Sequence, residues 1–287
     1  MRRYLGFYFP SCMAFCLALF FACSSDDLPE SFRLGGFRVL GIVASQPEVN
    51  PDDTVILTPI LSDLGGEGRA IMFSAKACVD PGVGFGAEPT CDENPTRVEL
   101  ASSQLATGLV APNYTGLLTS TVSVTVPASS IVFDQRSTSE QFNGINYLVV
   151  MQFEPDGQEV VRAFKRIVVS TKTIKNQNPT FDSSQLFSMG NPVTSLPSET
   201  MAINIDLSSA AIENYDEQTE TQEIVAKTET LETFWYISDG DLSPIITEAE
   251  NETTYTPPSV LPDSHDVLIV AITRDGRGGL ATLVFSY

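Results

Sequence analysis

Short runs of alternating hydrophobic and polar residues fill most of this chain. Val122, Val124 and Val126 fall on one side of an extended segment while Thr and Ser fall on the other, a period of two that is typical of a half-buried strand. Other runs rich in apolar residues predict further strands in the same half of the chain, at residues 37–44, 54–61, 69–78, 147–153 and 160–169. Pro155-Asp156-Gly157 separates the last two runs, and this turn chemistry predicts a hairpin.

Helical periodicity is nearly absent from this part of the sequence. Only residues 97–109 are ambiguous, because Val98, Leu100, Leu105 and Leu109 would line either a short helix or an irregular edge strand. About seven short strands with turns between them predict a β-sandwich. The Pro-rich bend at residues 46–53, placed between two apolar strands, resembles the opening of bacterial immunoglobulin-like modules.

A change in composition divides the chain after the last of these strands. Residues 171–180 are poor in apolar side chains, carry two lysines and end at Asn178-Pro179. We interpret this stretch as a linker between a first domain at residues 37–170, which holds a disulfide loop, and a second at residues 181–287. Alternation resumes at residues 201–207, as expected for a second β domain.

The second domain has its most informative pattern near the end of the chain. A strand at Phe234–Ile237 contains the only tryptophan, an apolar strand follows at Val267–Ile272, and the Gly-rich stretch Arg274–Gly279 leads into a final strand at 280–287. This arrangement resembles the polycystic-kidney-disease (PKD) repeat family of immunoglobulin-like sandwiches. The resemblance implies a second sandwich and says nothing about function. The predicted fold class is therefore all-β, with two immunoglobulin-like sandwiches in tandem.

The first 23 residues have a different character. Arg2 and Arg3 precede an apolar run from Leu5 to Phe21, and Ala22 then stands directly before Cys23. The end of this stretch resembles the lipobox of Gram-negative bacterial lipoproteins. The resemblance implies that residues 1–22 are a cleaved signal peptide, that Cys23 carries the lipid, and that residues 23–36 form a tether. By resemblance to lipoprotein sorting in Gram-negative bacteria, Ser24 in place of Asp implies location at the outer membrane.

Two alternatives to the lipoprotein signal stay open. The apolar run is close to the ~20 residues that span a bilayer, so an uncleaved anchor is possible in principle, although Pro10, Ser11 and Cys12 interrupt it. Ordinary secretory cleavage would leave Cys23 as a free thiol in an oxidising compartment.

The cysteines and the charge fit an extracytoplasmic protein. Of five cysteines, Cys12 and Cys16 leave with the signal and Cys23 is lipidated, which leaves Cys78 and Cys91 to pair. A bridge over 13 residues would stabilise the fold by roughly 3 kcal/mol, and a single histidine makes zinc the poorer alternative. The net charge is −20, which opposes binding to nucleic acid or to an anionic membrane surface through charge.

Candidate chemistry is sparse. The only histidine, His265, lies in a turn, and the chain has no nucleophile elbow, phosphate-binding loop, dinucleotide fingerprint or metalloprotease motif. We therefore expect no enzyme activity and no cofactor. Asp239, Asp241 and Asp275 are weak candidates for a calcium site, with turn aspartates that accept backbone hydrogen bonds as the simpler interpretation.

An acidic stretch from Glu213 to Glu232 is interpreted as a solvated loop and strand edge, with a patch for a cation or a basic partner as the alternative. The expected function is non-catalytic: binding or scaffolding an envelope protein or polysaccharide at the outer membrane. An adhesion or polysaccharide-binding protein and an accessory subunit of an envelope hydrolase are the alternatives.

Overall fold

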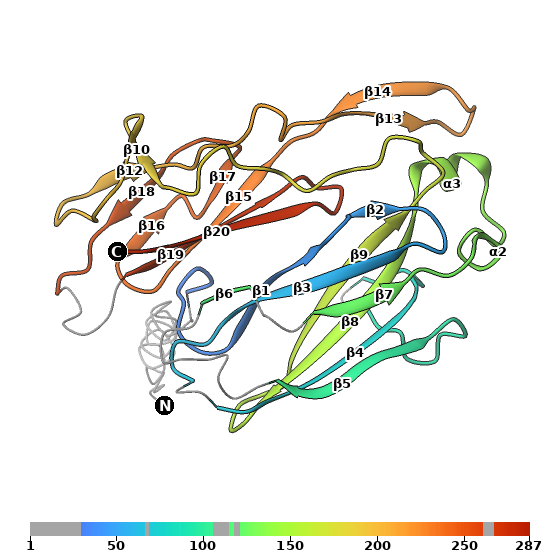
Figure 1. Ribbon diagram of the computed structural model, residues 1–287, viewed down its shortest axis with the longest axis horizontal. Helices are drawn as coiled ribbons and strands as arrows, with labels where there is room; N and C mark the ends of the chain where they lie inside the picture. The colour runs from blue at the N-terminus through green and yellow to red at the C-terminus, as the bar shows by residue number, and fades with distance from the viewer. Residues whose placement is uncertain (1–29, 67–68, 86, 106–114, 118–120, 261–266) are drawn as a thin grey trace, which may run out of the picture.

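The computed structural model describes residues 30–287 except 67–68, 86, 106–114, 118–120 and 261–266. The expected signal peptide, Cys23 and His265 lie outside the described residues. The fold is all-β, as the sequence predicts, and two β-sandwich units lie side by side along the long axis of the molecule (Figure 1). We refer to residues 38–169 as the first unit and residues 181–287 as the second unit.

The first unit consists of two sheets. The larger has five strands, in the spatial order β2 (Glu48–Val49), β9 (Val161–Val169), β8 (Ile145–Pro155), β4 (Ile71–Val79) and β5 (Val98–Leu105). The smaller is built on β3 (Thr54–Ser62), which pairs with β1 (Arg38–Ala44), β6 (Thr115–Leu117) and β7 (Val122–Thr125). The predicted β8–β9 hairpin is confirmed, and the ambiguous stretch after residue 97 is the edge strand β5.

Side chains on the facing sides of these sheets form the first core. Val122 and Val124 of β7 are buried, as their alternation with polar residues predicts. The rings of Phe73 and Phe153 meet with centroids 5.1 Å apart, in the range of favourable aromatic pairs. Two short helices, α2 (Ser129–Val132) and α3 (Thr138–Asn143), connect β7 to β8. The side chains of Ser137 and Glu140 cap the start of α3 reciprocally.

The second unit repeats the two-sheet plan. A four-stranded sheet runs in the order β17 (Ile246–Glu248), β15 (Glu232–Ile237), β19 (Leu268–Arg274) and β20 (Leu280–Ser286). A three-stranded sheet of β12 (Met201–Ile203), β18 (Thr253–Thr256) and β16 (Asp241–Ser243) covers one face of it, and β10 (Phe187–Ser188) pairs with β11 (Asn191–Pro192). Trp235 is buried between the sheets and donates from Nε1 to Thr247 Oγ1 at 3.0 Å, which satisfies its one polar group.

The acidic stretch after residue 213 forms a hairpin of β13 (Asn214–Gln218) and β14 (Ile224–Thr228) that reaches beyond the second unit and over α3 of the first (Figure 1). The side-chain amide of Asn143, the last residue of α3, bonds the backbone of Gln218 twice: Nδ2 donates to its carbonyl oxygen and Oδ1 accepts from its N–H, both at 2.7 Å. The hairpin is therefore attached to both units.

A third apolar cluster fills the space between the units. It contains the outward-facing side chains Leu268, Val270 and Ile272 of β19, together with Leu40 of β1 and Ile60 of β3. Strand β19 is thus buried on both faces, which explains why its sequence is continuously apolar and does not alternate.

The segments predicted to be a tether and a linker both pack against the folded units. Leu34 is buried, and its backbone N–H donates to the carbonyl oxygen of Ile237 at 2.8 Å, so residues 32–34 run along the second unit before the chain enters the first. In the linker, Asn178 donates to the carbonyl oxygen of Ala44 in β1 and accepts from the backbone N–H of Leu280 in β20. Both segments therefore take part in the interface between the units.

Candidate functional site

The β19–β20 turn carries Arg277 into the boundary between the two units. Asp275 shapes this turn, because its carboxylate accepts the backbone N–H groups of Arg277 at 2.7 Å and of Gly279 at 2.8 Å. Gly276 and Gly278 both have positive φ, at 74° and 108°, a conformation that glycine adopts at little cost. The local sequence thus dictates a tight turn that points one arginine toward the first unit.

Arg277 forms ion pairs with three glutamates. Its Nη1 lies 2.6 Å from Glu229 Oε1 and 3.5 Å from Glu213 Oε2, and its Nη2 lies 3.2 Å from Glu48 Oε2. The carboxylates of Glu48 and Glu229 are each only 1% exposed. Because Glu48 belongs to β2 of the first unit, these ion pairs connect the two units directly. We call Arg277, Glu48, Glu213 and Glu229 the interdomain ion cluster.

The linker segment completes this cluster. Glu48 also accepts the hydroxyl of Ser170 and, at 2.9 Å, the backbone N–H of Asn176. The side-chain amide of Asn176 donates to Asp275 at 2.7 Å. Each buried carboxylate therefore has several hydrogen-bond donors, which is the condition under which buried charge is tolerated.

Burial also changes the protonation behaviour of the cluster. It raises the pKa of the Glu229 carboxyl, while the N–H of Glu213 and the charge of Arg277 act in the opposite direction. Burial likewise raises the pKa of Glu213. Burial has the opposite effect on amines, and it lowers the pKa of Lys172 and of Lys175 nearby.

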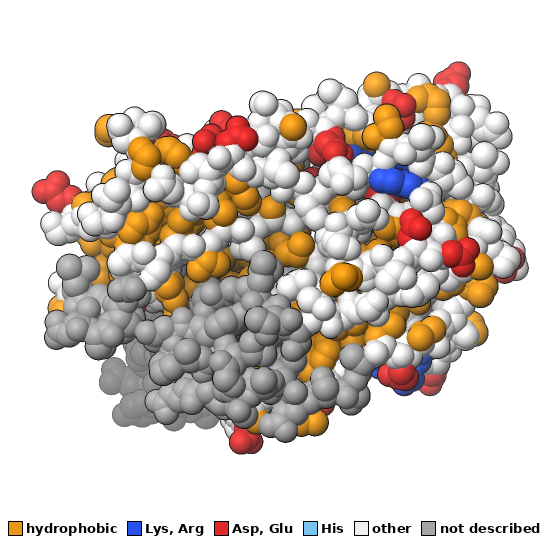
Figure 2. Space-filling model, viewed as in Figure 1, with side chains coloured by type: hydrophobic (Ala, Val, Ile, Leu, Met, Phe, Trp, Pro, Cys, Tyr) orange, Lys and Arg blue, Asp and Glu red, His pale blue; other side chains and the backbone are white. Residues whose placement is uncertain are grey.

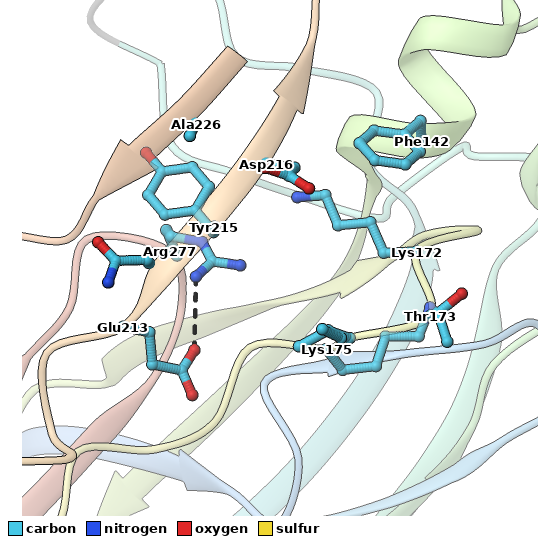
Figure 3. Close-up of a pocket in the computed structure, with 11 residues that line it drawn as sticks. Phe142, Lys172, Thr173, Lys175, Glu213, Tyr215, Asp216, Ala226 and Arg277 are labelled. Atoms are coloured by element: carbon cyan, nitrogen blue, oxygen red, sulfur yellow. Dashed lines mark ion pairs between the residues drawn. The ribbon is translucent and has the colours of Figure 1, made fainter. Parts of the chain in front are cut away.

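A cavity of about 260 Å³ opens beside the cluster, between the linker, α3 and the β13–β14 hairpin (Figure 3). The Lys172 amine lies between two rings, 5.6 Å from the centroids of both Phe142 and Tyr215, and the Arg277 guanidinium lies 4.1 Å from the Tyr215 centroid. These are distances at which a cation is attracted to a ring face. The aromatic faces are thus already in contact with the protein's own cations.

The arrangement connects elements of both units through charged side chains. Among the described residues, no three His, Cys, Asp or Glu side chains are placed to hold a metal ion, and Arg277 is shared by three carboxylates. What the geometry provides is a set of charged contacts between β2, the linker, the β13–β14 hairpin and the β19–β20 turn.

No pattern in the sequence brings these four residues together. Glu213 and Glu229 were assigned to a solvated loop and strand edge, which is wrong for Glu229, because its carboxylate is buried against Arg277. The sequence around Arg277 predicts a glycine-rich turn between two strands and does not indicate the glutamates that it meets. Glu48 carried no signal beyond its place in a Pro-rich bend.

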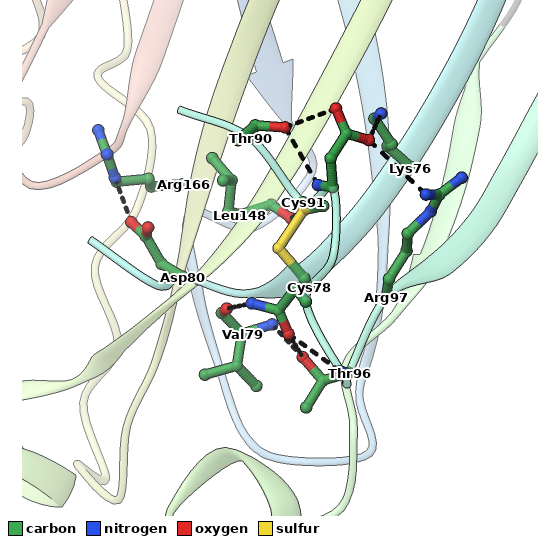
Figure 4. Close-up of a disulfide and its surroundings, with 12 residues drawn as sticks. Lys76, Cys78, Val79, Asp80, Thr90, Cys91, Thr96, Arg97, Leu148 and Arg166 are labelled. Atoms are coloured by element: carbon green, nitrogen blue, oxygen red, sulfur yellow. Dashed lines mark hydrogen bonds and ion pairs between the residues drawn. A yellow bond between two sulfur atoms is a disulfide. The ribbon is translucent and has the colours of Figure 1, made fainter. Parts of the chain in front are cut away.

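The expected disulfide is present. Cys78 of β4 and Cys91 are bonded, with Cα atoms 5.7 Å apart and both residues fully buried (Figure 4). They pack with Leu148 and Val150 of β8. Asn94 donates to the carbonyl oxygen of Val79 at 3.0 Å, so hydrogen bonds also hold the loop against β4.

The three aspartates considered for calcium do not meet. Asp239 and Asp241 lie at the turn between β15 and β16, beside the start of β19, whereas Asp275 follows the end of β19. Asp241 pairs with Arg33 at 3.0 Å, and Asp275 shapes the Arg277 turn. The described residues therefore do not bring these three aspartates together, and Asp275 accepts backbone hydrogen bonds, as the turn interpretation expects.

Comparisons with known proteins assign no family. No family model matches the chain, and no curated protein matches it. Among solved structures, the chain is similar to Escherichia coli alpha-2-macroglobulin activated by porcine elastase, with a TM-score of 0.28 and 9% identity, over 89% of this chain and 22% of that one. It is also similar to Spo0M, a sporulation control protein from Bacillus subtilis, with a TM-score of 0.27 and 10% identity, over 88% of this chain and 91% of that one.

The chain thus spans about a fifth of the length of the first of these structures, and at such scores neither similarity indicates a function. The described part of the chain contains no helix long and apolar enough to span a bilayer.

Proposed function

We propose that this protein is a non-catalytic, lipid-anchored protein of the bacterial envelope, in which two β-sandwich units held in one orientation bind or scaffold another envelope component. The sequence supports the location through Ala22-Cys23 after an apolar run, and the paired Cys78 and Cys91 fit an oxidising compartment. The proposal of a binding role rests on one observation above all. The interdomain ion cluster, formed by Arg277 and three glutamates, joins the two units through buried charge.

A fixed orientation of the two units favours binding. A partner that contacts both units then does not have to pay the entropy cost of ordering them relative to each other. The third apolar cluster, which contains Val270, and the hydrogen bonds of Asn178 also hold the two units together, as the interdomain ion cluster does. The surface is strongly acidic overall, and acidic side chains are scattered over both units on the face in Figure 2. This charge favours a protein or neutral polymer as partner over nucleic acid.

Lipidation is tested by growing cells with radiolabelled palmitate. We expect label in the wild-type protein and none after Cys23→Ala, with Cys16→Ala as a matched control that keeps the label. Label retained by Cys23→Ala would overturn the anchor.

The fixed orientation is tested by distance measurement between spin labels at Glu159 and Glu199, which are exposed and lie in different units. Attachment through an unnatural amino acid avoids the native cysteines. We expect one narrow distance distribution in the wild-type protein and a broad one after Arg277→Gln. A broad distribution in the wild-type protein would contradict the scaffold.

A further inference from the structure

A second cavity between the units, of about 430 Å³, differs from the first in its charge. Strands β1 and β9 form one wall, and the β19–β20 turn with its flanking residues forms the other. Of the described residues, three basic ones line it, Arg162, Lys165 and Arg274, and no acidic one does. The chain as a whole carries 36 acidic and 16 basic residues. The charged side chains that line this cavity therefore have the opposite sign from the net charge of the protein.

Lys165 is buried there without a counter-ion. Its residue is 8% exposed, and its amine donates to the carbonyl oxygen of Gly278. No carboxylate lies within ion-pair distance of this amine among the described residues. Burial lowers the pKa of Lys165 to about 8; the charge of Asp275 opposes this shift and the charge of Arg274 adds to it. Two positive charges therefore lie close enough to repel each other.

Arg274 is also without an ion pair in the described part of the chain. Its Nη2 donates to the carbonyl oxygen of Leu40 at 3.3 Å, and its guanidinium lies 4.5 Å from the centroid of Phe234. Its Nε is buried and has no hydrogen-bond partner. An unpaired buried donor of this kind costs free energy comparable to a lost hydrogen bond.

Arg277, three residues further along the chain, has very different surroundings from those of Arg274. There, three glutamates surround one guanidinium. Arg162 at the rim of the second cavity has its own partner in Glu88, at 3.2 Å, and both side chains are well exposed. Lys165 is thus a buried cation and Arg274 a half-buried one, and neither forms an ion pair with a carboxylate of the described chain.

We propose that this cavity binds an oxyanion, a phosphate or carboxylate group carried by a small organic molecule with a compact apolar body. Lys165 and Arg274 supply the charge for the anionic group. Leu40, Ile42, Phe164 and Leu280 supply apolar wall. The volume is within the range of small-molecule sites. Because the walls come from both units, the ligand would contact both, and binding would add to the attachment between them.

The test uses purified full-length protein and three probes: inorganic phosphate, phenyl phosphate and benzoate, each titrated by calorimetry at constant ionic strength with chloride as the reference. Phenyl phosphate is expected to bind at least tenfold more tightly than inorganic phosphate, because only the former also covers the apolar wall. Tighter binding of benzoate than of phenyl phosphate would identify the carboxylate as the preferred group, and the opposite order would identify the phosphate.

Two substitutions locate the site. Lys165→Met keeps the length of the side chain and removes its charge, and Arg274→Gln keeps a donor and removes the charge. Each is expected to weaken phenyl phosphate binding at least tenfold, while Lys227→Met, which removes an amine paired with Glu217 on the surface, leaves it unchanged. Equal binding by all variants, or no binding of any probe to the wild-type protein, would overturn the proposal. Thermal melts of each variant verify that it is folded.

Discussion

Arg277 and Lys165 are both basic side chains at the boundary between two sandwiches, yet their surroundings are opposite. Three carboxylates surround Arg277, and two of them are almost fully buried. The Lys165 amine donates to a backbone carbonyl oxygen and, among the described residues, forms no ion pair. The free-energy cost of a buried charge depends on what compensates it, so substitution of these two residues should have opposite consequences.

Arg277→Gln should strongly destabilise the protein. The substitution leaves Glu48 and Glu229 buried without their cation, and breaking a buried pair in this way costs about 3–5 kcal/mol. Urea denaturation followed by the fluorescence of Trp235, the only tryptophan, measures the loss in the free energy of unfolding.

The matched control for this prediction is Arg97→Gln. Arg97 pairs with Glu99 and Asp92 on the surface, where solvent screens the charges, so its midpoint of denaturation should stay close to that of the wild-type protein. Equal midpoints for both variants would contradict the importance of the interdomain ion cluster.

Lys165→Met should change how stability depends on pH. Because burial lowers the pKa of Lys165 in the folded state to about 8, the unfolded chain binds the extra proton between that value and the ordinary one. The wild-type free energy of unfolding should therefore gain roughly 3 kcal/mol from this residue as pH rises from 8 to 10.5, and lose it again as pH falls from 10.5 to 8.

The measurement compares wild-type and Lys165→Met proteins at pH 7.5 and pH 10, without added phosphate or carboxylate. The difference between the two proteins isolates the contribution of Lys165 from that of the rest of the chain, including the neighbouring charges of Asp275 and Arg274. A difference that does not change with pH would contradict this prediction.

Strands and turns with a clear local sequence pattern could be predicted. Strands that are stabilised mainly by contacts with distant parts of the chain could not. The alternation in β7 and the Pro-Asp-Gly turn of the β8–β9 hairpin were both informative, because each depends on neighbouring residues alone. The β13–β14 hairpin was missed because all five residues of β14 are exposed, so no hydrophobic period indicates a strand. Hydrogen bonds from Asn143 of α3 to the backbone of β13 help to hold the hairpin in place.

Asn143→Ala should loosen this hairpin. The substitution removes both hydrogen bonds to the backbone of Gln218, and at ~1 kcal/mol each their loss should raise amide exchange of β13 roughly tenfold or more. Hydrogen–deuterium exchange with mass spectrometry resolves the segment. Asn191→Ala removes only a bond to the nearby Met189 carbonyl oxygen, and should leave exchange in the hairpin unchanged; an equal response to both substitutions would contradict the assigned role of Asn143.

At the scale of the whole molecule, the two sandwiches share a buried boundary. Leu268, Val270 and Ile272 point out of the second unit and pack against Leu40 and Ile60 of the first. An unbroken apolar strand such as β19 is itself a signal of burial on both faces, and it could have indicated that the second unit does not stand alone. The partner of that face is visible only in the tertiary structure.

Val270→Asp should uncouple the units. A carboxylate at this fully buried position would be charged in an apolar surrounding, and the units should separate before either core unfolds. Calorimetry should show one transition for the wild-type protein and two for the variant. Val160→Asp, at an exposed position in the first unit, is the control and should keep the single transition; two transitions in the wild-type protein would contradict a shared boundary.

The sequence by itself determined the all-β class, most strand positions in the first unit, and the pairing of Cys78 with Cys91. These features follow from periodicity, turn chemistry and the number of cysteines left after the N-terminal segment, all of which are local or countable. The resemblance of residues 1–23 to a lipoprotein signal stays a prediction.

Only the tertiary structure decided which charges meet. Glu48 and Arg277 are 229 positions apart, and no pattern in either segment indicates the other. The same holds for Lys165 and Arg274, which lie between the two sandwiches and form no ion pair within the described part of the chain. Whether two charged side chains form an ion pair depends on the distance between them in the folded protein. The pattern of residues along the chain does not contain that distance.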